Sequence, residues 1–385
     1  MSPFNTHIHL PPNFSAFETV DQAVSLAAAQ GISVLGANNY YDFGVYAEFA
    51  ALAREKNIFP QFGLEVICLI DTLQASGVKL NDPGNPGKLY LCGKGMMGYH
   101  PLSAEAASLL QTIRDADSER MALVVTTLAS LFAKSGLETN LSADAIKRRI
   151  AARHGSPLET IYLQERHVAQ AFQEAFFEEV PGADRSHLLE TLFGTSSQSK
   201  PTDAAAVQSE IRSQLLKSGR PAYVPETFVG FDHAYRLLLA LGSIPSYPVL
   251  ADGVFPRTDY EQSPDALAAD LQVRGIPAAE FIPNRNTPAV LSRYTHTLHD
   301  AGLLITAGTE HNTPELLPLA PTCLGGEAIP EDVQKIFWEG TCIVAAHQHL
   351  TANKLPGFSP GSDLDEFRAL GESVLGKRIN QGSSI

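Results

Sequence analysis

The sequence predicts an α/β protein built on a parallel sheet or barrel that an all-α insertion interrupts. Short apolar runs alternate with segments of helical periodicity in both the first and the last part of the chain, which is typical of parallel strands joined by helices. Between residues 102 and 218 the strand patterns disappear and helical spacing remains. We therefore expect three segments: the first part of the barrel at 1–101, the helical insertion at 102–218, and the second part of the barrel with C-terminal helices at 219–385.

The first part contains a regular strand and helix alternation. A strand at 6–10 is followed by a helix at 17–30, whose apolar face includes Val20, Val24 and Ala27 and which Gly31 stops. A strand at 32–37, a helix at 46–56 and a strand ending at 63–66 repeat the pattern. A turn-rich segment at 71–88 leads into a strand at 89–92, and we expect the glycine-rich stretch 93–98 to be a flexible loop.

The insertion and the second part follow the same rules. Helical spacing predicts four helices in the insertion, at 121–137, 143–154, 160–177 and 204–216. Beyond Pro221 we expect a helix at 233–241 and strands at 246–251, 279–283 and 303–307. Ser263-Pro264 and Thr287-Pro288 each open a helix as N-cap and first-turn proline. Two further helices are expected near 331–345 and 364–375.

Composition limits the classes of function. The chain has 385 residues, and its acidic residues outnumber the basic ones by 42 to 28, which disfavours binding to a nucleic-acid duplex. No apolar run reaches the roughly 18 residues of a membrane span, and no signal-peptide pattern is present at the start. The four cysteines are too far apart for a Cys-x-x-Cys site and are typical of a reducing compartment. We expect a soluble cytoplasmic protein without a membrane partner; the sequence leaves its oligomeric state open.

Two histidines share a face of the first strand. Alternate strand residues point the same way, so His7 and His9 lie about 7 Å apart and can bind one metal ion or one phosphate. Chemistry in α/β folds gathers at the carboxyl ends of strands. The polar residues predicted there are His7, His9, Asn38, Asn39, Glu65, Tyr90, Asp252, Asn284, Arg285, Glu310, His311 and Asn312. Histidine and carboxylate ligands without cysteine are typical of a catalytic zinc, manganese or iron site.

The order of these motifs resembles the polymerase-and-histidinol-phosphatase (PHP) family, and within it the bacterial phosphoesterases with a helical insertion. The matching stretches follow one another from residue 4 to about 315 in unbroken order. They are the His-x-His at 6–9, then 28–39, 62–65, 165–169, 219–225, 244–253, 279–285 and 302–312. The resemblance implies a distorted (β/α)7 TIM-like barrel with a cluster of up to three metal ions that hydrolyses phosphoester bonds.

Some positions depart from the family pattern. Phe14 stands at a ligand aspartate, Asn39 and Tyr90 stand at histidines, and Asn312 stands at the final histidine. Asp252 replaces a histidine and Glu310 an aspartate, and both can still bind metal. The metal ligands that we predict are therefore His7, His9, Glu65, Asp252 and Glu310. They suggest one or two manganese, zinc or iron ions rather than three.

Two residues are candidates for catalytic roles. Arg285 offers a planar fork for phosphoryl oxygens, and His311 can protonate the leaving oxygen. Each has a structural alternative, which is a salt bridge to a neighbouring carboxylate for Arg285 and a hydrogen bond to a loop carbonyl for His311. The expected substrate-binding residues are Asn39, Tyr90, Asn284, Arg285 and Asn312.

The sequence leaves the activity open between different classes. The first hypothesis is a PHP-type hydrolase in which metal-bound hydroxide attacks a small phosphorylated substrate. The second is a degenerate PHP-like barrel that binds an anionic ligand or partner without hydrolysis, which Phe14, Asn39, Tyr90 and Asn312 favour. A third is a metal-assisted reaction on a carbohydrate-like or acyl substrate, because a fold does not determine a reaction.

Overall fold

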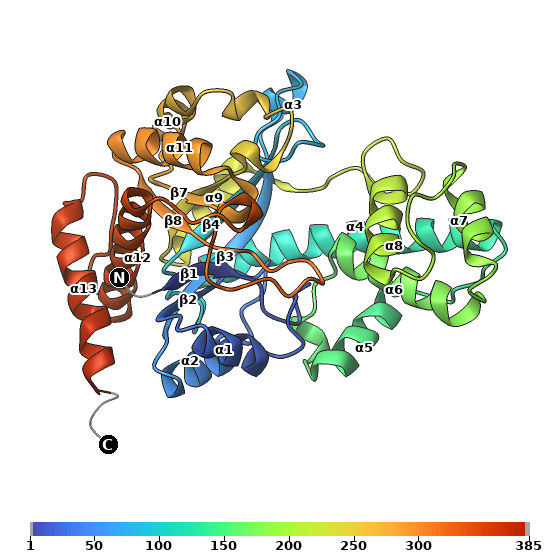
Figure 1. Ribbon diagram of the computed structural model, residues 1–385, viewed down its shortest axis with the longest axis horizontal. Helices are drawn as coiled ribbons and strands as arrows, with labels where there is room; N and C mark the ends of the chain where they lie inside the picture. The colour runs from blue at the N-terminus through green and yellow to red at the C-terminus, as the bar shows by residue number, and fades with distance from the viewer. Residues whose placement is uncertain (1–2, 382–385) are drawn as a thin grey trace. The chain divides into compact units, whose positions relative to one another are not determined.

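The computed structural model describes residues 3–381, with side chains up to residue 376, and the chain divides into two compact units (Figure 1). The first unit consists of Met1–Pro11, Ser15–Gln111 and Val229–Ile385, and the second of Pro12–Phe14 and Thr112–Phe228. The predicted insertion at 102–218 overlaps the second unit. We describe each unit by itself.

Seven strands of the first unit form a nearly closed barrel. Their order is β1 (Phe4–Ile8), β2 (Val34–Ala37), β3 (Phe59–Leu69), β4 (Lys88–Lys94), β6 (Ile244–Val249), β7 (Ala278–Phe281) and β8 (Leu304–Ala307), with β5 (Val229–Gly230) paired to β3 outside this path. The ring closes where the backbone N–H groups of Thr309 and Glu310 donate to the carbonyl oxygen of His7, at 3.1 and 2.9 Å. The predicted α/β barrel is confirmed.

One strand runs against the predicted direction. β4 is antiparallel to both β3 and β6, whereas we expected parallel strands. Its register sets Cys92 opposite Glu65 and Lys94 opposite Gly63. Because paired and alternate residues share a face, Tyr90, Cys92 and Lys94 point to the same side of the sheet as Glu65. The stretch 93–98, predicted to be a loop, therefore begins inside a strand and carries a buried lysine.

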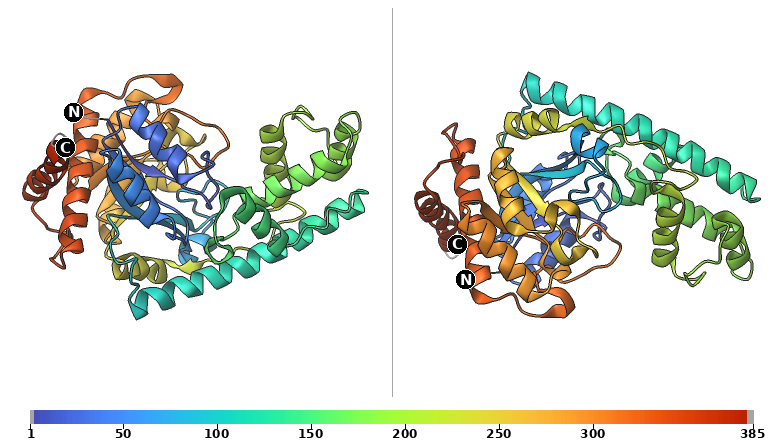
Figure 2. Two further views of the ribbon diagram at one scale, coloured as in Figure 1. Left: turned by 90° about the horizontal axis from the view of Figure 1, so that it is seen from below. Right: turned by 90° about the horizontal axis from the view of Figure 1, so that it is seen from above.

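The first unit also contains helices between and after its strands. They are α1 (Val20–Ala29), α2 (Tyr46–Glu55), α3 (Asp71–Ala75), α9 (Phe231–Ala240), α10 (Pro264–Val273), α11 (Pro288–Asp300), α12 (Glu331–Ala352) and α13 (Leu364–Gln381). As predicted, Ser263 caps α10 by accepting a hydrogen bond from the N–H of Ala266, and Pro264 occupies the first turn. α12 and α13 pack side by side at the end of the chain (Figure 2). None of the described helices combines the length and the apolar character that crossing a membrane requires.

The described residues of the second unit form helices without a strand. The helices are α4 (Ala104–Lys134), which begins in the first unit, α5 (Ala143–His154), α6 (Glu165–Glu179), α7 (Arg185–Phe193) and α8 (Ala204–Ile211), which continues as a π turn at Arg212–Leu216. Buried aromatic rings form part of the core. The ring centroids of Phe132 and Phe172 are 5.0 Å apart. The sequence did not predict α7, because only Leu189 of this helix is fully buried and its apolar pattern is weak.

Candidate metal centre

His7, His9 and Glu65 converge at one end of the barrel. His7 Nε2 lies 3.3 Å from His9 Nε2 and 3.4 Å from Glu65 Oε2, and His9 Nε2 lies 3.6 Å from the same oxygen. Tetrahedral bonds of about 2.0–2.2 Å place neighbouring ligand atoms roughly 3.3–3.6 Å apart. The three atoms therefore have the spacing of ligands to one ion, and we call this group the upper cluster.

The upper cluster is held by β1 and β3, which lie on either side of β2 in the sheet. His7 is the fourth residue of β1, and His9 follows at the end of that strand, where its N–H donates to the carbonyl oxygen of Glu310. The ring of Tyr40 stacks on His9 with centroids 5.2 Å apart, and Tyr40 forms a parallel bridge with Glu65. Both histidines are completely buried and Glu65 is 5% exposed, so the cluster is largely shielded from water.

The charges in the upper cluster depend on one another. Burial raises the pKa of Glu65, but hydrogen bonds and charges of His7 and His9 outweigh it and hold this pKa well below its usual range. Burial lowers the pKa of His7, but the charge of Glu280 and hydrogen bonds with Cys92 and Glu280 together outweigh it and raise this pKa well above its usual value. A metal ion binds the unprotonated imidazole, so it would replace a proton in this cluster.

Three residues behind His7 were missed by the sequence analysis: Cys92, Lys94 and Glu280. The Nδ1 of His7 lies 2.6 Å from Glu280 Oε2, and the other carboxylate oxygen forms an ion pair with Lys94. Burial raises the pKa of Glu280, but Lys94 and His7 outweigh it and lower this pKa to about 2. A carboxylate on the far nitrogen of a ligating histidine is common in metal sites, because it orients the ring.

A signal for one of these residues was present in the sequence. Glu280 is the only charged residue in the otherwise apolar strand β7. An acid at a fully buried strand position needs a buried partner, so this residue pointed to a polar interior.

Glu310 lies near the upper cluster but pairs with a different residue. Its carboxylate forms an ion pair with Arg285 and accepts a hydrogen bond from Asn312 Nδ2 at 2.9 Å. Among the described residues it belongs to no group of three ligand atoms within 4.8 Å. Burial raises the pKa of Glu310, but the charge and hydrogen bond of Arg285, together with the charge of His7, outweigh this and lower it. The structural alternative for Arg285, a salt bridge, is therefore present.

No protein-family model matches this chain, and no curated protein matches it in sequence. The fold is similar to that of several solved structures, among them the following two. An amidohydrolase from Chromobacterium violaceum, with bound sulfate and no metal, is 16% identical over 87% of this chain and 97% of its own, with a TM-score of 0.54. A candidate metal-dependent phosphoesterase from Bifidobacterium adolescentis is 14% identical over 88% of this chain and 98% of its own, with a TM-score of 0.58. The barrel fold that the PHP resemblance implied is thus confirmed.

The structure does not bring Asp252 into the upper cluster. Its carboxylate accepts hydrogen bonds from Arg257 at 2.6 Å and from the hydroxyl of Thr287 at 2.7 Å. These partners occupy both carboxylate oxygens. We therefore remove Asp252 from the proposed ligand set.

Asn39 and His311 have structural roles in place of the predicted ones. Asn39 is fully buried, and its amide accepts from the N–H of Leu10 at 2.8 Å and donates to the carbonyl of Leu10 at 3.0 Å. His311 lies 2.6 Å from the Thr309 hydroxyl through Nδ1 and 2.9 Å from the Leu317 carbonyl through Nε2. These hydrogen bonds engage both polar groups of the Asn39 amide and both ring nitrogens of His311 within the protein.

Asn284 and Tyr90 are two further residues that the sequence predicted to bind substrate. Asn284, in the turn Pro283–Arg285 that follows β7, has a buried Oδ1 without a hydrogen-bond partner among the described residues. Tyr90 is half-buried on β4, and the ammonium of Lys88 lies 5.3 Å from its ring centroid. Both stay predictions as substrate-binding residues.

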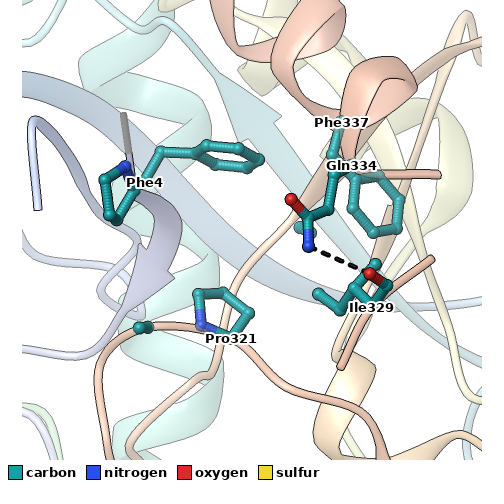
Figure 3. A pocket seen from close by; sticks show the side chains of 8 residues that line it. Phe4, Pro321, Ile329, Gln334 and Phe337 are labelled. Carbon is teal, nitrogen blue, oxygen red and sulfur yellow. Dashed lines mark hydrogen bonds between the residues drawn. The ribbon is translucent and has the colours of Figure 1, made fainter. Parts of the chain in front are cut away.

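A pocket outside the barrel has a different character. Figure 3 shows it between the start of β1 and α12, where Gln334 Nε2 donates to the carbonyl of Ile329 at 2.9 Å. Its lining consists of Pro3, Phe4, Ala307, Ala320, Pro321, Ile329, Gln334 and Phe337. Because this lining contains no titratable side chain, we assign it no part in the chemistry.

Proposed function

We propose that this chain is a metal-dependent hydrolase of the PHP type that acts on a small phosphorylated substrate. The upper cluster of His7, His9 and Glu65 is the observation that supports the proposal, because its three atoms have the spacing of ligands to one ion. Two imidazoles and one carboxylate suit zinc, manganese or iron. When bound, the ion would supply Lewis acidity toward a phosphoryl oxygen and lower the pKa of a water molecule.

The surrounding charges favour an anionic substrate. Lys94 balances Glu280, and Arg285 balances Glu310, so Glu65 is the one unbalanced carboxylate of this group. With a divalent ion and neutral histidines, the site would carry one net positive charge. Such a charge in a buried, weakly screened place attracts phosphate esters.

Arg285 is the residue that we propose to bind the phosphoryl group. Its side chain is 35% exposed while it holds Glu310, so the side chain is partly accessible to a ligand. The side-chain amide of Asn312 also donates a hydrogen bond to the Glu310 carboxylate. The planar fork of arginine can pair with a carboxylate on one edge and a phosphate on the other.

Tyr40 is the residue that we propose to keep Glu65 in position. Burial and the charge of Glu65 raise the pKa of Tyr40 well above its usual value, so its hydroxyl keeps its proton and can donate to that carboxylate. Its ring covers His9 on one side. Tyr40 thus limits the movement of two ligands at once.

The second candidate is a barrel that binds an anion without hydrolysis. It is favoured by the arginines on Asp252 and Glu310, which leave three ligands for the ion. Elemental analysis of the purified protein, followed by assays on phosphomonoesters and phosphodiesters with added manganese or zinc, distinguishes the two. We expect about one equivalent of metal and turnover that Glu65→Gln abolishes. Metal-loaded, folded protein without turnover on any ester would favour the binding role.

A further inference from the structure

A second set of ligand atoms shares His7 with the upper cluster. One atom each of His7, Cys92 and Glu280 lies within 4.8 Å of the others, and we call this set the lower cluster. All three side chains are completely buried. Imidazole, thiol and carboxylate together resemble a zinc site, so the lower cluster is by composition a candidate for a second ion.

A cation of the protein itself already occupies the lower cluster. The ammonium of Lys94 forms an ion pair with Glu280 Oε1 and donates to the carbonyl oxygen of Thr6 at 3.2 Å. The Lys94 side chain is 3% exposed and that of Glu280 is 0% exposed, so water screens neither charge. A metal ion on Glu280 would lie a few ångströms from this ammonium, where like charges repel strongly in a medium of low dielectric constant.

The same ion pair determines which nitrogen of His7 is available. Lys94 holds one carboxylate oxygen of Glu280, and the other lies 2.6 Å from His7 Nδ1. An ionised carboxylate there keeps the proton of a neutral imidazole on Nδ1. The lone pair of Nε2 then faces His9 and Glu65, where the upper cluster needs it.

We propose that Lys94 is a built-in cation that excludes metal from the lower cluster and, through Glu280, orients His7 toward a single ion in the upper cluster. Lys94 is thus a positioning residue. The binding of one ion in the upper cluster rests on the proposed function. The exclusion of metal from the lower cluster depends on Lys94 and Glu280 alone.

Cobalt(II) titration followed by absorption spectroscopy tests this proposal. Cobalt–thiolate bonds give intense near-ultraviolet bands, so the spectrum reports whether Cys92 is a ligand. We expect the wild-type protein to bind one equivalent of cobalt without a thiolate band. Lys94→Met keeps an unbranched, flexible side chain that is one atom shorter and removes its charge. We expect this variant to show the thiolate band and at least one ion bound through Cys92.

Two further variants serve as controls. Lys88→Met changes another buried lysine of β4, which pairs with Asp82 at 3.3 Å, and should give the wild-type spectrum. Adding Cys92→Ser to Lys94→Met should remove the new band. If Lys94→Met does not fold, as judged by circular dichroism, Lys94→Gln replaces it in the same comparison.

The outcomes separate this proposal from the function. A thiolate band in the wild-type protein, or a second equivalent of cobalt bound there, overturns the exclusion by Lys94. A folded Lys94 variant without the band also overturns it. If the wild-type protein binds no cobalt while the variant gains the thiolate-bound ion, the proposed function fails and the role of Lys94 at the lower cluster stands.

Discussion

Gly308 lies against His7 so closely that a Cβ on the glycine would come within 2.7 Å of the His7 backbone nitrogen. This contact is at the point where β8 meets β1 and the barrel closes. The neighbour is backbone, which cannot rotate away as a side chain can. The position of His7, and with it the upper cluster, therefore depends on residue 308 being a glycine, which has no side chain.

Gly308→Ala should accordingly disturb both stability and metal binding. We expect a loss of about 1–3 kcal/mol in the free energy of unfolding, which is typical of overpacking, together with weaker zinc binding. Urea unfolding and competition with a chromogenic chelator measure the two effects. Gly376→Ala, in helix α13 with open space around it, is the matched control and should leave zinc affinity unchanged. Wild-type zinc affinity in Gly308→Ala would contradict the dependence on this contact.

Glu65→Gln and Asp252→Asn distinguish two of the three predicted carboxylate ligands. Glu65 lies in the upper cluster, so its loss should weaken zinc binding by more than the roughly 10–100-fold that loss of an outer partner causes. Asp252 is held by Arg257 and Thr287, so its replacement should change zinc affinity only a few-fold. Isothermal titration calorimetry measures both. Equal losses would mean that Asp252 moves to the ion when it binds.

The metal-free protein should lose stability as the pH rises above neutrality. The pKa of His7 in the folded protein is raised above the usual 6.5, so its contribution is complete below about pH 6.5 and is lost as the pH rises through the higher folded value. The expected slope approaches about 1.4 kcal/mol per pH unit. Urea unfolding with a chelator from pH 6 to 9 measures it. His7→Gln should lack this slope, and an equal slope in the variant would assign it to other groups.

Arg285→Met should weaken substrate binding and leave metal binding intact. Its guanidinium holds Glu310 outside the two ligand clusters, so zinc affinity should change little. Loss of a charge-assisted contact to phosphate should raise KM by roughly 10–100-fold, which corresponds to about 1.5–3 kcal/mol. Arg274→Met removes an arginine that pairs with Asp270 on helix α10 and is the control. An unchanged KM in Arg285→Met would assign Arg285 to structure alone.

The spacing of apolar residues along the chain predicted most of the helices and strands. The alternation of His7 and His9 on a strand, and the polar residues after later strands, indicated the barrel and the three side chains that converge in the upper cluster. Strand direction has no such signature in periodicity, so antiparallel β4 was not predicted and Lys94 was assigned to a loop. The sequence also did not reveal which side chains pair with each other in the folded protein. Asp252 and Glu310 are chemically able to bind metal, but only the fold shows that arginines hold them.

The interruption of the barrel also affects how it is made. Strands β1–β4 leave the ribosome before Thr112–Phe228, and β6–β8 leave after it. At about 5–20 residues per second, synthesis of the intervening unit takes on the order of 10 seconds. During this interval β1 and β4 are the open edges of a half-built sheet, and unpaired edges attract other chains. The edge of β4 pairs only when β6 has been made, and the edge of β1 only when the residues after β8 follow, so both edges wait for the last part of the chain.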